Sequence, residues 1–229
     1  MNLAHLANIT YIRQKETRGL GHAISCAKAF VGDEPFAVLY GDDVILGEDP
    51  ACGQLIRAYN ETGKGVVGVK EVSEEAIQRY SSLKVEPLHD NWFTCTDMIE
   101  KPSKDKIMSL YSILGRCVLP PQIFDILANT APGAGGEIQL TDAMCELART
   151  ESMIAVDFTG KRYDMVNKLG VMRAQVEVAL STPRLAKASA PTLKSLPRRF
   201  KCKVDSHYTY VKFNRFVKSI NFTKRLYQI

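Results

Sequence analysis

Long apolar runs are absent from this sequence of 229 residues. No stretch approaches the roughly eighteen apolar residues of a membrane-spanning helix, and the start, Met1 to His5, lacks the layout of a signal peptide. The six cysteines form no C-x-x-C pair, so neither a zinc site nor a disulfide framework is indicated. We therefore expect a cytoplasmic protein with reduced cysteines and no membrane partner.

A basic stripe is also missing from most of the chain. The net charge is +5, but residues 186–229 carry +10 and residues 1–185 carry −5. The mildly acidic first part argues against nucleic acid as its partner. The tail mixes Lys and Arg with aromatic residues such as Tyr208 and Phe213, as single-strand binders do, so nucleic acid stays an alternative there. We favour a disordered or adventitious extension.

Apolar patterning alternates between strands and helices over residues 1–185. The expected strands are Ile9–Arg13, Phe36–Tyr40, Gly65–Val69, Phe93–Ile99, Tyr111–Leu119 and Met153–Phe158. The expected helices are Gly21–Phe30, Gln54–Asn60, Pro121–Asn129, Gln139–Ala148 and Val166–Leu180, with a polar helix between the strands at 99 and 111. This order predicts an α/β domain over residues 1–185, with a mixed or parallel sheet wrapped by helices, followed by the tail of residues 186–229.

The most informative junction is the point where the apolar run Phe36 to Tyr40 ends in Gly41-Asp42-Asp43. The run is typical of a buried strand, and ligands of α/β sheets sit outside the carboxyl ends of such strands. Two adjacent carboxylates there favour a divalent cation, typically Mg²⁺ shared with phosphate oxygens. Gly and Asp are also ordinary turn residues, so a simple turn with an Asp cap is the alternative.

Several further motifs follow one another in a fixed order. They are Arg13-Gln14, Gly19-Leu20-Gly21-His22-Ala23, Gly41-Asp42-Asp43, Glu100-Lys101-Pro102, Gly115-Arg116, the block from Pro132 to Asp142, and Arg162-Tyr163-Asp164. From about Ile9 to Leu185 the chain closely resembles the bacterial UTP:glucose-1-phosphate uridylyltransferases. Each motif is weak alone, but the ordered set is specific.

The resemblance implies a Rossmann-like nucleotidyltransferase fold with a mixed, mostly parallel sheet flanked by helices. It implies an enzyme that joins UTP to glucose 1-phosphate, giving UDP-glucose and pyrophosphate, with Mg²⁺ as cofactor. In such a reaction the protein mainly positions the reacting groups and neutralises charge. Homo-oligomers are also expected from the family.

The resemblance also implies roles for charged residues. Asp42 matches a metal-binding catalytic aspartate, and Asp164 matches the second acid, so the two share one Mg²⁺. Lys101 matches the catalytic lysine that reaches the sugar phosphate, and Glu100 matches the acid that accepts hydrogen bonds from sugar hydroxyls. Both can serve one ligand only if Pro102 bends or ends the strand, because adjacent strand residues point to opposite sides.

The remaining expected substrate contacts are Gln14, Gly19, Asp43, Gly115 and Glu137. Gln14 and Gly19 match the residues that read the edge of uracil. An amide that donates and accepts at once suits that edge, and glycine lets the backbone approach the ring. Gly115 and Glu137 match sugar contacts.

Departures from the family pattern qualify this prediction. The family's phosphate loop, G-x-G-T-R-x-x-P-x-T-K, has no counterpart in the 229 residues. The resemblance therefore implies an N-terminally truncated member that lacks the first strand and has impaired activity. Ser81 and Val166 stand where the family has glycine, and Val166 is expected to crowd the loop behind Asp164.

Alternatives remain open at this point. A related sugar-phosphate nucleotidyltransferase using TTP or ATP, and a non-catalytic module with a nucleic-acid-binding tail, are the other function classes. Taken without the family, Glu100-Lys101-Pro102 is a commonplace surface turn. We expect His22 to be a packed helix residue and not a catalytic base, because phosphate oxygens attack already deprotonated.

Overall fold

The computed structural model describes residues 7–188. The chain divides into two compact units, Met1–Met165 and Val166–Ile229, which are described one at a time. The tail after residue 188, with its expected aromatic and basic contacts, lies outside the described residues. The boundary expected at residue 185 falls inside the second unit and stays a prediction.

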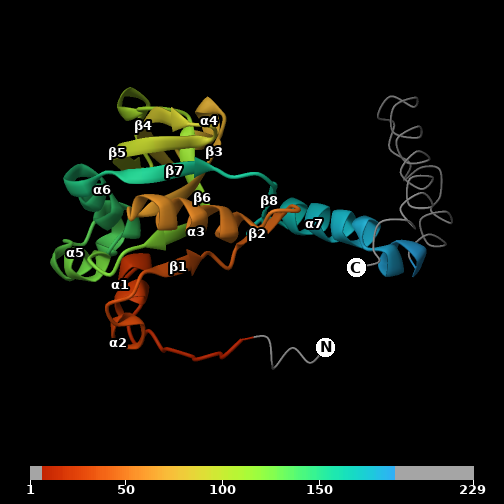
Figure 1. Cartoon of the computed structure of the whole chain (residues 1–229), viewed down its shortest axis with the longest axis horizontal. Helices are drawn as coiled ribbons and strands as arrows, with labels where there is room; N and C mark the ends of the chain where they lie inside the picture. Colours follow the sequence, from red (N-terminus) through yellow and green to blue (C-terminus); the bar gives the residue numbers. More distant parts are fainter. Residues whose placement is uncertain (1–6, 189–229) are drawn as a thin grey trace. The chain divides into compact units, whose positions relative to one another are not determined.

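The first unit is built on a six-stranded sheet with the order β1-β6-β3-β7-β5-β4 (Figure 1). Its strands are β1 (Phe36–Leu39), β3 (Val66–Glu71), β4 (Ser81–His89), β5 (Trp92–Glu100), β6 (Tyr111–Leu119) and β7 (Met153–Asp157). A second, two-stranded sheet pairs β2 (Asp43–Leu46) with β8 (Lys161–Asp164). The expected α/β nucleotidyltransferase class with a mixed sheet and flanking helices is confirmed.

We expected most neighbouring strands of the sheet to run parallel, and the observed strand pairing corrects this expectation. In the six-stranded sheet only β3 and β7 run parallel, and the other four neighbouring pairs are antiparallel. One cause is the short connection between β4 and β5, where Asp90 has a φ of 48°. A two-residue turn can only join antiparallel strands, whereas a parallel pair needs a long crossover.

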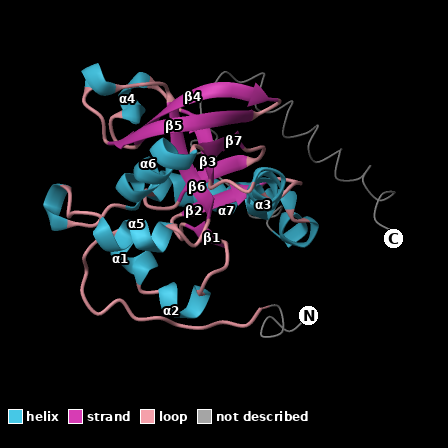
Figure 2. Ribbon diagram, turned by 60° about the vertical axis from the view of Figure 1, so that its left-hand side comes forward, coloured by secondary structure: helices cyan, strands magenta, loops and turns pink. Residues whose placement is uncertain are grey.

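Helices cover both faces of this sheet (Figure 2). In the first unit they are α1 (Leu20–Ser25), α2 (Lys28–Val31), α3 (Ala51–Thr62), α4 (Glu74–Ile77), α5 (Ile123–Asn129) and α6 (Leu140–Glu151), with 3₁₀ turns at Lys104–Lys106 and Ala134–Gly136. Helix α3 packs on one face of the sheet, and α5 and α6 pack on the other. Figure 2 shows α3 on one side of the strands and α1, α5 and α6 on the opposite side.

The alternation along the central strands explains why these strands are apolar throughout. On β7, Ile154 and Val156 pack towards α3, whereas Met153 and Ala155 pack towards α6. Successive side chains of a strand point to opposite faces, so a sheet covered on both faces needs apolar residues at every position. The short continuous apolar runs in the sequence are therefore central strands.

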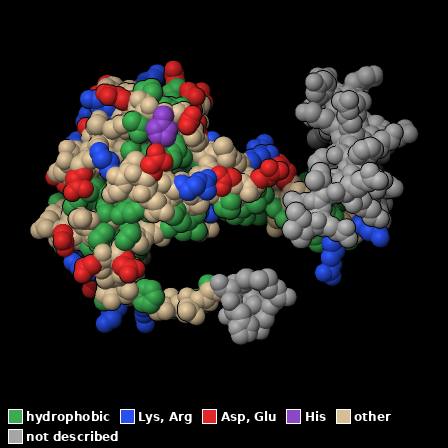
Figure 3. Space-filling view, viewed as in Figure 1, with side chains coloured by type: hydrophobic (Ala, Val, Ile, Leu, Met, Phe, Trp, Pro, Cys, Tyr) green, Lys and Arg blue, Asp and Glu red, His purple; other side chains and the backbone are tan. Residues whose placement is uncertain are grey.

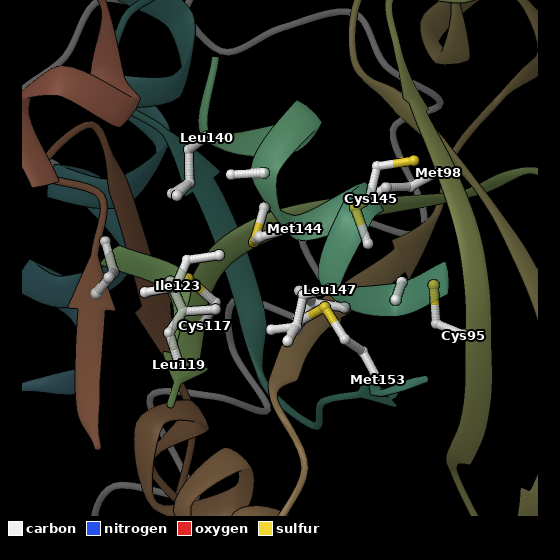
Figure 4. Close-up of a cluster of buried hydrophobic side chains, with 14 of the residues drawn as sticks. Cys95, Met98, Cys117, Leu119, Ile123, Leu140, Met144, Cys145, Leu147 and Met153 are labelled. Atoms are coloured by element: carbon white, nitrogen blue, oxygen red, sulfur yellow. The ribbon is translucent and has the colours of Figure 1, made fainter. Parts of the chain in front are cut away.

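Sulfur-containing side chains fill much of the larger core, as Figure 4 shows for Met98, Met144 and Cys145. Burial raises the pKa of Cys95 and of Cys117 to about 12, because a thiolate would lose its hydration. These thiols remain protonated and act as small apolar packing groups.

Two expected elements at the N-terminal side are corrected. Ile9–Arg13 forms no strand, and the side chains of Ile9 and Tyr11 are exposed. The helix expected over Gly21–Phe30 is broken into α1 and α2, because the N–H of Ala27 bonds the carbonyl of Ile24 in a tight i, i+3 turn. The polar helix expected before Tyr111 is only the 3₁₀ turn at Lys104–Lys106.

Strand β1 was expected to be buried, but it is an edge strand that pairs only with β6 among the described residues. Val38 alone is buried, and the side chain of Leu39 is 55% exposed. The apolar run therefore predicts the strand but not its place in the sheet, because periodicity does not distinguish a central strand from an edge strand.

The second unit begins with α7 (Lys168–Ser181), close to the helix expected over Val166–Leu180. The side chain of Asn167 caps it by accepting a hydrogen bond from the N–H of Gly170. None of the helices in residues 7–188 is long and apolar enough to cross a membrane.

Gln54 of α3 ties this helix to the segment after β7. Its buried amide donates to the carbonyls of Asp49 and Thr159 and accepts from the N–H of Thr159 at 2.8 Å. Replacing Gln54 by Met keeps the volume and leaves these backbone groups without partners, so we expect unfolding to become easier by about 2 kcal/mol. Thermal melts measure the loss, and Gln78→Met, at the exposed C-cap of α4, is the control. Equal melting temperatures for the two variants would contradict this role.

Candidate active site

The turn after β1 presents the carboxylates at the edge of the sheet. The N–H of Asp43 donates to the carbonyl of Tyr40 at 3.2 Å, which closes the turn. Arg116 of β6 donates from Nη1 to the carbonyls of Gly115 and Asp43 at 2.7 and 3.2 Å. The turn is therefore bound to β6 on its inner side, and Asp42 is left exposed at its tip.

Pairing of β2 with β8 brings together acids that are far apart in the sequence. Asp43 lies opposite Asp164 in the antiparallel ladder, and the N–H of Met165 donates to the carbonyl of Asp42 at 2.8 Å. Asp42 and Asp164 thus sit on adjacent segments, and their sharing of one cation stays a prediction.

Asp43 is buried and bound to Arg162. Its Oδ1 accepts hydrogen bonds from both Nε and Nη2 of Arg162 at 2.6 Å, and its side chain is 5% exposed. Burial raises the pKa of the Asp43 carboxyl, and the charges of Asp42 and Asp164 act in the same direction, whereas Arg162 lowers it. The expected substrate contact of Asp43 stays a prediction, but the structure gives this carboxylate an internal partner.

The donors at this edge fit a hard cation. Carboxylate oxygens are the ligands that Mg²⁺ prefers, and Mg²⁺ commonly takes only one or two carboxylates while keeping several waters. No cluster of three or more His, Cys, Asp or Glu ligands occurs in residues 7–188, so a site here would be of this water-rich kind. Arg162 pairs with Asp43, whereas Asp42 is exposed at the tip of the turn.

A cleft of about 480 Å³ opens beside this turn. It is lined by Asp42, Asp43 and Arg162 and adjoins a second cleft of about 180 Å³. The two clefts share Leu20, Tyr40, Tyr80 and Ile113. The two clefts are therefore neighbours that share part of their lining.

The second cleft carries Glu100 at the end of β5. Glu100 Oε2 accepts a hydrogen bond from Thr141 Oγ1 at 3.0 Å, and Gln139 lines the same cleft. A larger hollow of about 580 Å³ between α5 and α6 contains none of the expected site residues.

Lys101 follows Glu100 with a φ of 46°, a left-handed conformation that is uncommon outside glycine. Its N–H donates to the carbonyl of Tyr80 at 2.7 Å, and β5 ends at Glu100. The strand therefore ends where the Glu-Lys-Pro motif requires it to end, so the side chains of Glu100 and Lys101 are not forced to opposite faces. Lys101 itself is exposed.

Gln14 and Gly19 lie together, because Gln14 Nε2 donates to the carbonyl of Gly19 at 3.1 Å. The same nitrogen lies 2.9 Å from His22 Nδ1. The amide nitrogen of Gln14 thus lies against protein atoms, and the expected contact of this amide with a base edge stays a prediction. His22 is half-buried on α1, as expected for a packed residue, but its contact with Gln14 was not expected.

Glycine at position 19 is required by protein packing. A Cβ there would lie 2.8 Å from Glu137 Cβ and 2.8 Å from the carbonyl oxygen of Ile138, and φ is +93°. The segment around Gly19 is bonded to this neighbour, with the N–H of Ile138 donating to the carbonyl of Arg18 at 2.8 Å. Glu137, expected at the sugar, thus lies beside Gly19 and bonds Gln139 through its Oε2.

Gly115 also has an internal reason for being glycine. It has a φ of +84°, and a Cβ would lie 2.7 Å from Ile45 Cδ1 of β2. It stands at a register shift between β3 and β6, where the sheet makes room for the β2–β8 pair. Its expected contact with a sugar stays a prediction.

Ser81 and Val166 stand at the two positions where the family has glycine. Ser81 is buried. Its hydroxyl contacts Ser112 Oγ at 3.3 Å and accepts from the N–H of Ile113 at 3.1 Å, so the added polar group is satisfied internally. Val166 is 76% exposed, which does not support the expected crowding.

The similarity of the chain to known proteins agrees with this arrangement. The profile of the nucleotidyl transferase family matches residues 2–177. The chain belongs to this family.

Two curated relatives carry the name that the ordered motifs predict. UTP–glucose-1-phosphate uridylyltransferase 2 of Staphylococcus saprophyticus is 50% identical over 175 residues, covering 76% of this chain and 61% of the relative. UTP–glucose-1-phosphate uridylyltransferase YngB of Bacillus subtilis is 43% identical over 197 residues, covering 86% and 66%. The chain thus spans 61–66% of the length of these relatives, and the predicted resemblance is confirmed.

A solved structure shows the same fold. The structure of UDP-glucose pyrophosphorylase complexed with UDP-glucose superposes with a TM-score of 0.71 at 37% identity, covering 74% of this chain and 65% of that one. The nucleotidyl transferase fold inferred from the motifs is therefore supported by sequence and by structure.

Three residues that organise the site of this nucleotidyl transferase have no role predicted from the sequence. Arg162 and Arg116 lie within the motifs, and Thr141 lies within the expected helix Gln139–Ala148. An arginine two residues from a predicted metal ligand is a usable signal, because a cluster of carboxylates needs an internal cation. The contact between Thr141 and Glu100 joins segments 41 residues apart and has no signal in the sequence.

The pair of Asp43 and Arg162 gives a stability prediction for this nucleotidyl transferase. Arg162→Met leaves Asp43 buried without a partner, and we expect a loss of about 3 kcal/mol in the free energy of unfolding. The double variant Asp43→Asn with Arg162→Met removes both charges and should lose less. Chemical denaturation measures both, and Arg57→Met, which breaks the exposed pair with Asp49, is the control. The losses in the free energy of unfolding of Asp43→Asn and of Arg162→Met are then added. A double variant that loses as much as this sum would contradict a coupled pair.

Proposed function

We propose that the chain carries the metal, sugar and base side of a UTP:glucose-1-phosphate uridylyltransferase site. The observation that carries the proposal is that two neighbouring clefts, one lined by Asp42 and the other by Glu100, share part of their lining. Relatives of this name at 43–50% identity support it. The substrates are then UTP and glucose 1-phosphate, and the products are UDP-glucose and pyrophosphate.

The reaction needs positioned charges more than a base. An oxygen of glucose 1-phosphate attacks the α-phosphorus of UTP in line, a new P–O bond forms, and the bond to the pyrophosphate oxygen breaks. The attacking oxygen is already deprotonated, so no side chain needs to remove a proton. Mg²⁺ held by Asp42 and Asp164 would screen the charge of the phosphate oxygens.

The other proposed residues contact the sugar phosphate, the sugar and the base. Lys101 contacts the sugar phosphate, and Glu100, oriented by Thr141, accepts hydrogen bonds from sugar hydroxyls. Gly115 and Glu137 line the sugar, and Gln14 with Gly19 faces the uracil. Asp43 is the remaining proposed contact, and its bond to Arg162 keeps the turn in place.

Surface charge is consistent with a small-molecule substrate. Figure 3 shows acidic and basic side chains interspersed over the described part of the first unit, without a continuous basic stripe on the face in view.

Self-association and a cytoplasmic location are further parts of the proposal. The second rests on the five cysteines within residues 7–188, which are all free thiols.

Asp42 gives the metal test. Replacing Asp42 by Ala removes an exposed carboxylate of the cation site, so we expect magnesium-dependent binding of UDP-glucose to weaken at least tenfold. Isothermal titration calorimetry with and without Mg²⁺ measures this, and Asp125→Ala, remote from both clefts, is the control. Unchanged magnesium-dependent binding by the Asp42 variant would remove it from the site.

Lys101 gives the phosphate test. Lys101→Met removes a charged contact to the sugar phosphate and keeps the base contacts, so UDP-glucose should bind less tightly while uridine is unaffected. Lys104→Met, which deletes the same charge three residues later, is the matched control. Equal losses for UDP-glucose and uridine would mean that the lysine acts on folding and not on phosphate.

Turnover tests the whole reaction. Since the 229 residues contain no G-x-G-T-R loop to hold the triphosphate, we expect pyrophosphate release by this chain alone to be near background. Fusing the corresponding segment of a relative before Ile9 should give magnesium-dependent release from UTP and glucose 1-phosphate. A folded fusion that is inactive with UTP, or that prefers TTP or ATP, would overturn the proposed substrate.

A further inference from the structure

The side-chain amide of Gln14 is held in one orientation by the protein itself. It lies in the loop that leads into α1, drawn in red in Figure 1. Its Nε2 lies 3.1 Å from the carbonyl oxygen of Gly19 and 2.9 Å from Nδ1 of His22. Both distances are those of ordinary hydrogen bonds.

The amide nitrogen has two hydrogens and no more. One hydrogen goes to Gly19, whose carbonyl can only accept, and this fixes which end of the amide is the nitrogen. The second goes to His22 Nδ1, which must then be the unprotonated nitrogen of a neutral ring that carries its hydrogen on Nε2. Both donors of Gln14 are therefore used within the protein.

The amide oxygen is left as the group that meets a ligand. Within residues 7–188, Gln14 Oε1 has no protein hydrogen-bond partner, and no side-chain oxygen or nitrogen is both buried and unbonded. The described residues therefore neither bury nor bond Gln14 Oε1. The side chain presents a pure acceptor on its outer side.

We propose that His22 is a positioning residue that selects the base by fixing the Gln14 amide. The proposal rests on the proposed function, in which Gln14 faces the base. An outward acceptor matches the N3–H of uracil, which is a donor. Cytosine in the same position would bring the lone pair of its N3 against Oε1. Thymine has the same imide edge as uracil, so this device separates imide bases from cytosine and does not separate uracil from thymine.

Without the acceptor on His22, only the carbonyl of Gly19 holds the amide nitrogen inward, so a flip of the amide costs less. A flipped Gln14 would present N–H outward and would suit the N3 of cytosine as well as it now suits uracil. A site that hydrogen-bonds a ligand discriminates because a mismatched group leaves a polar atom unpaired. Loss of His22 should therefore change selectivity between bases more than it changes overall binding.

The test compares UDP-glucose with CDP-glucose, which share the sugar and the diphosphate and differ only in the base. Calorimetry in the presence of Mg²⁺ on the full chain should give at least tenfold tighter binding of UDP-glucose. His22→Leu should lower this ratio about fivefold, the equivalent of one hydrogen bond. His22→Asn, which returns an acceptor near the position of Nδ1, should restore it. His89→Leu, at the β4–β5 turn, is the matched control.

Each other outcome counts against the inference. An unchanged ratio in His22→Leu, or equal weakening of both ligands with a lower melting temperature, would show that His22 only supports folding, while the proposed function stands. Failure of the unaltered chain to bind either ligand would overturn the proposed function and the inference together. Nitrogen NMR of the imidazole is independent of ligands, and a hydrogen found on Nδ1 would overturn the proposal directly.

Discussion

The pairing of β2 with β8 is the constraint on which the candidate site depends. Asp43 lies opposite Asp164 in this ladder, and like charges facing each other across a strand pair are destabilising. Arg162, on the same small sheet, bonds Asp43 with both Nε and Nη2 and supplies the internal counter-charge. The ladder therefore holds an acid-rich turn against its own repulsion.

The rest of the first unit supports this ladder. Arg116 binds the carbonyls of the turn from β6, and Gly115 keeps the space that Ile45 of β2 occupies. The apolar core on both faces of the sheet fixes β6, so the turn is attached to a rigid element. Sites built on packed strands hold their geometry more closely than sites built on loops alone. The base side is different, since Gln14 lies on an exposed loop and depends on Gly19 and His22 for its orientation.

Glycines in this chain show how one residue type can suggest two explanations. Gly19 and Gly115 were expected to let a ligand approach the backbone. In the structure a Cβ at either position would meet protein atoms at less than 3 Å, from Glu137 and Ile138 or from Ile45. Packing against the backbone of Ile138 thus requires glycine at position 19, whereas at position 115 the positive φ of +84° is the stronger reason, since the end of the Ile45 side chain can shift. A ligand contact at either position would be an additional role.

The sequence by itself determined the α/β class, most of the helices and strands, the family, and the set of residues to examine. It could do so because apolar periodicity and short ordered motifs are local along the chain. Only the tertiary structure decided that β1 is an edge strand, that most strand pairs are antiparallel, and that Arg162, Thr141 and His22 contact Asp43, Glu100 and Gln14. Edge position and strand direction depend on which strands meet, and a contact such as that of Asp43 with Arg162, 119 residues apart, leaves no local pattern in the sequence.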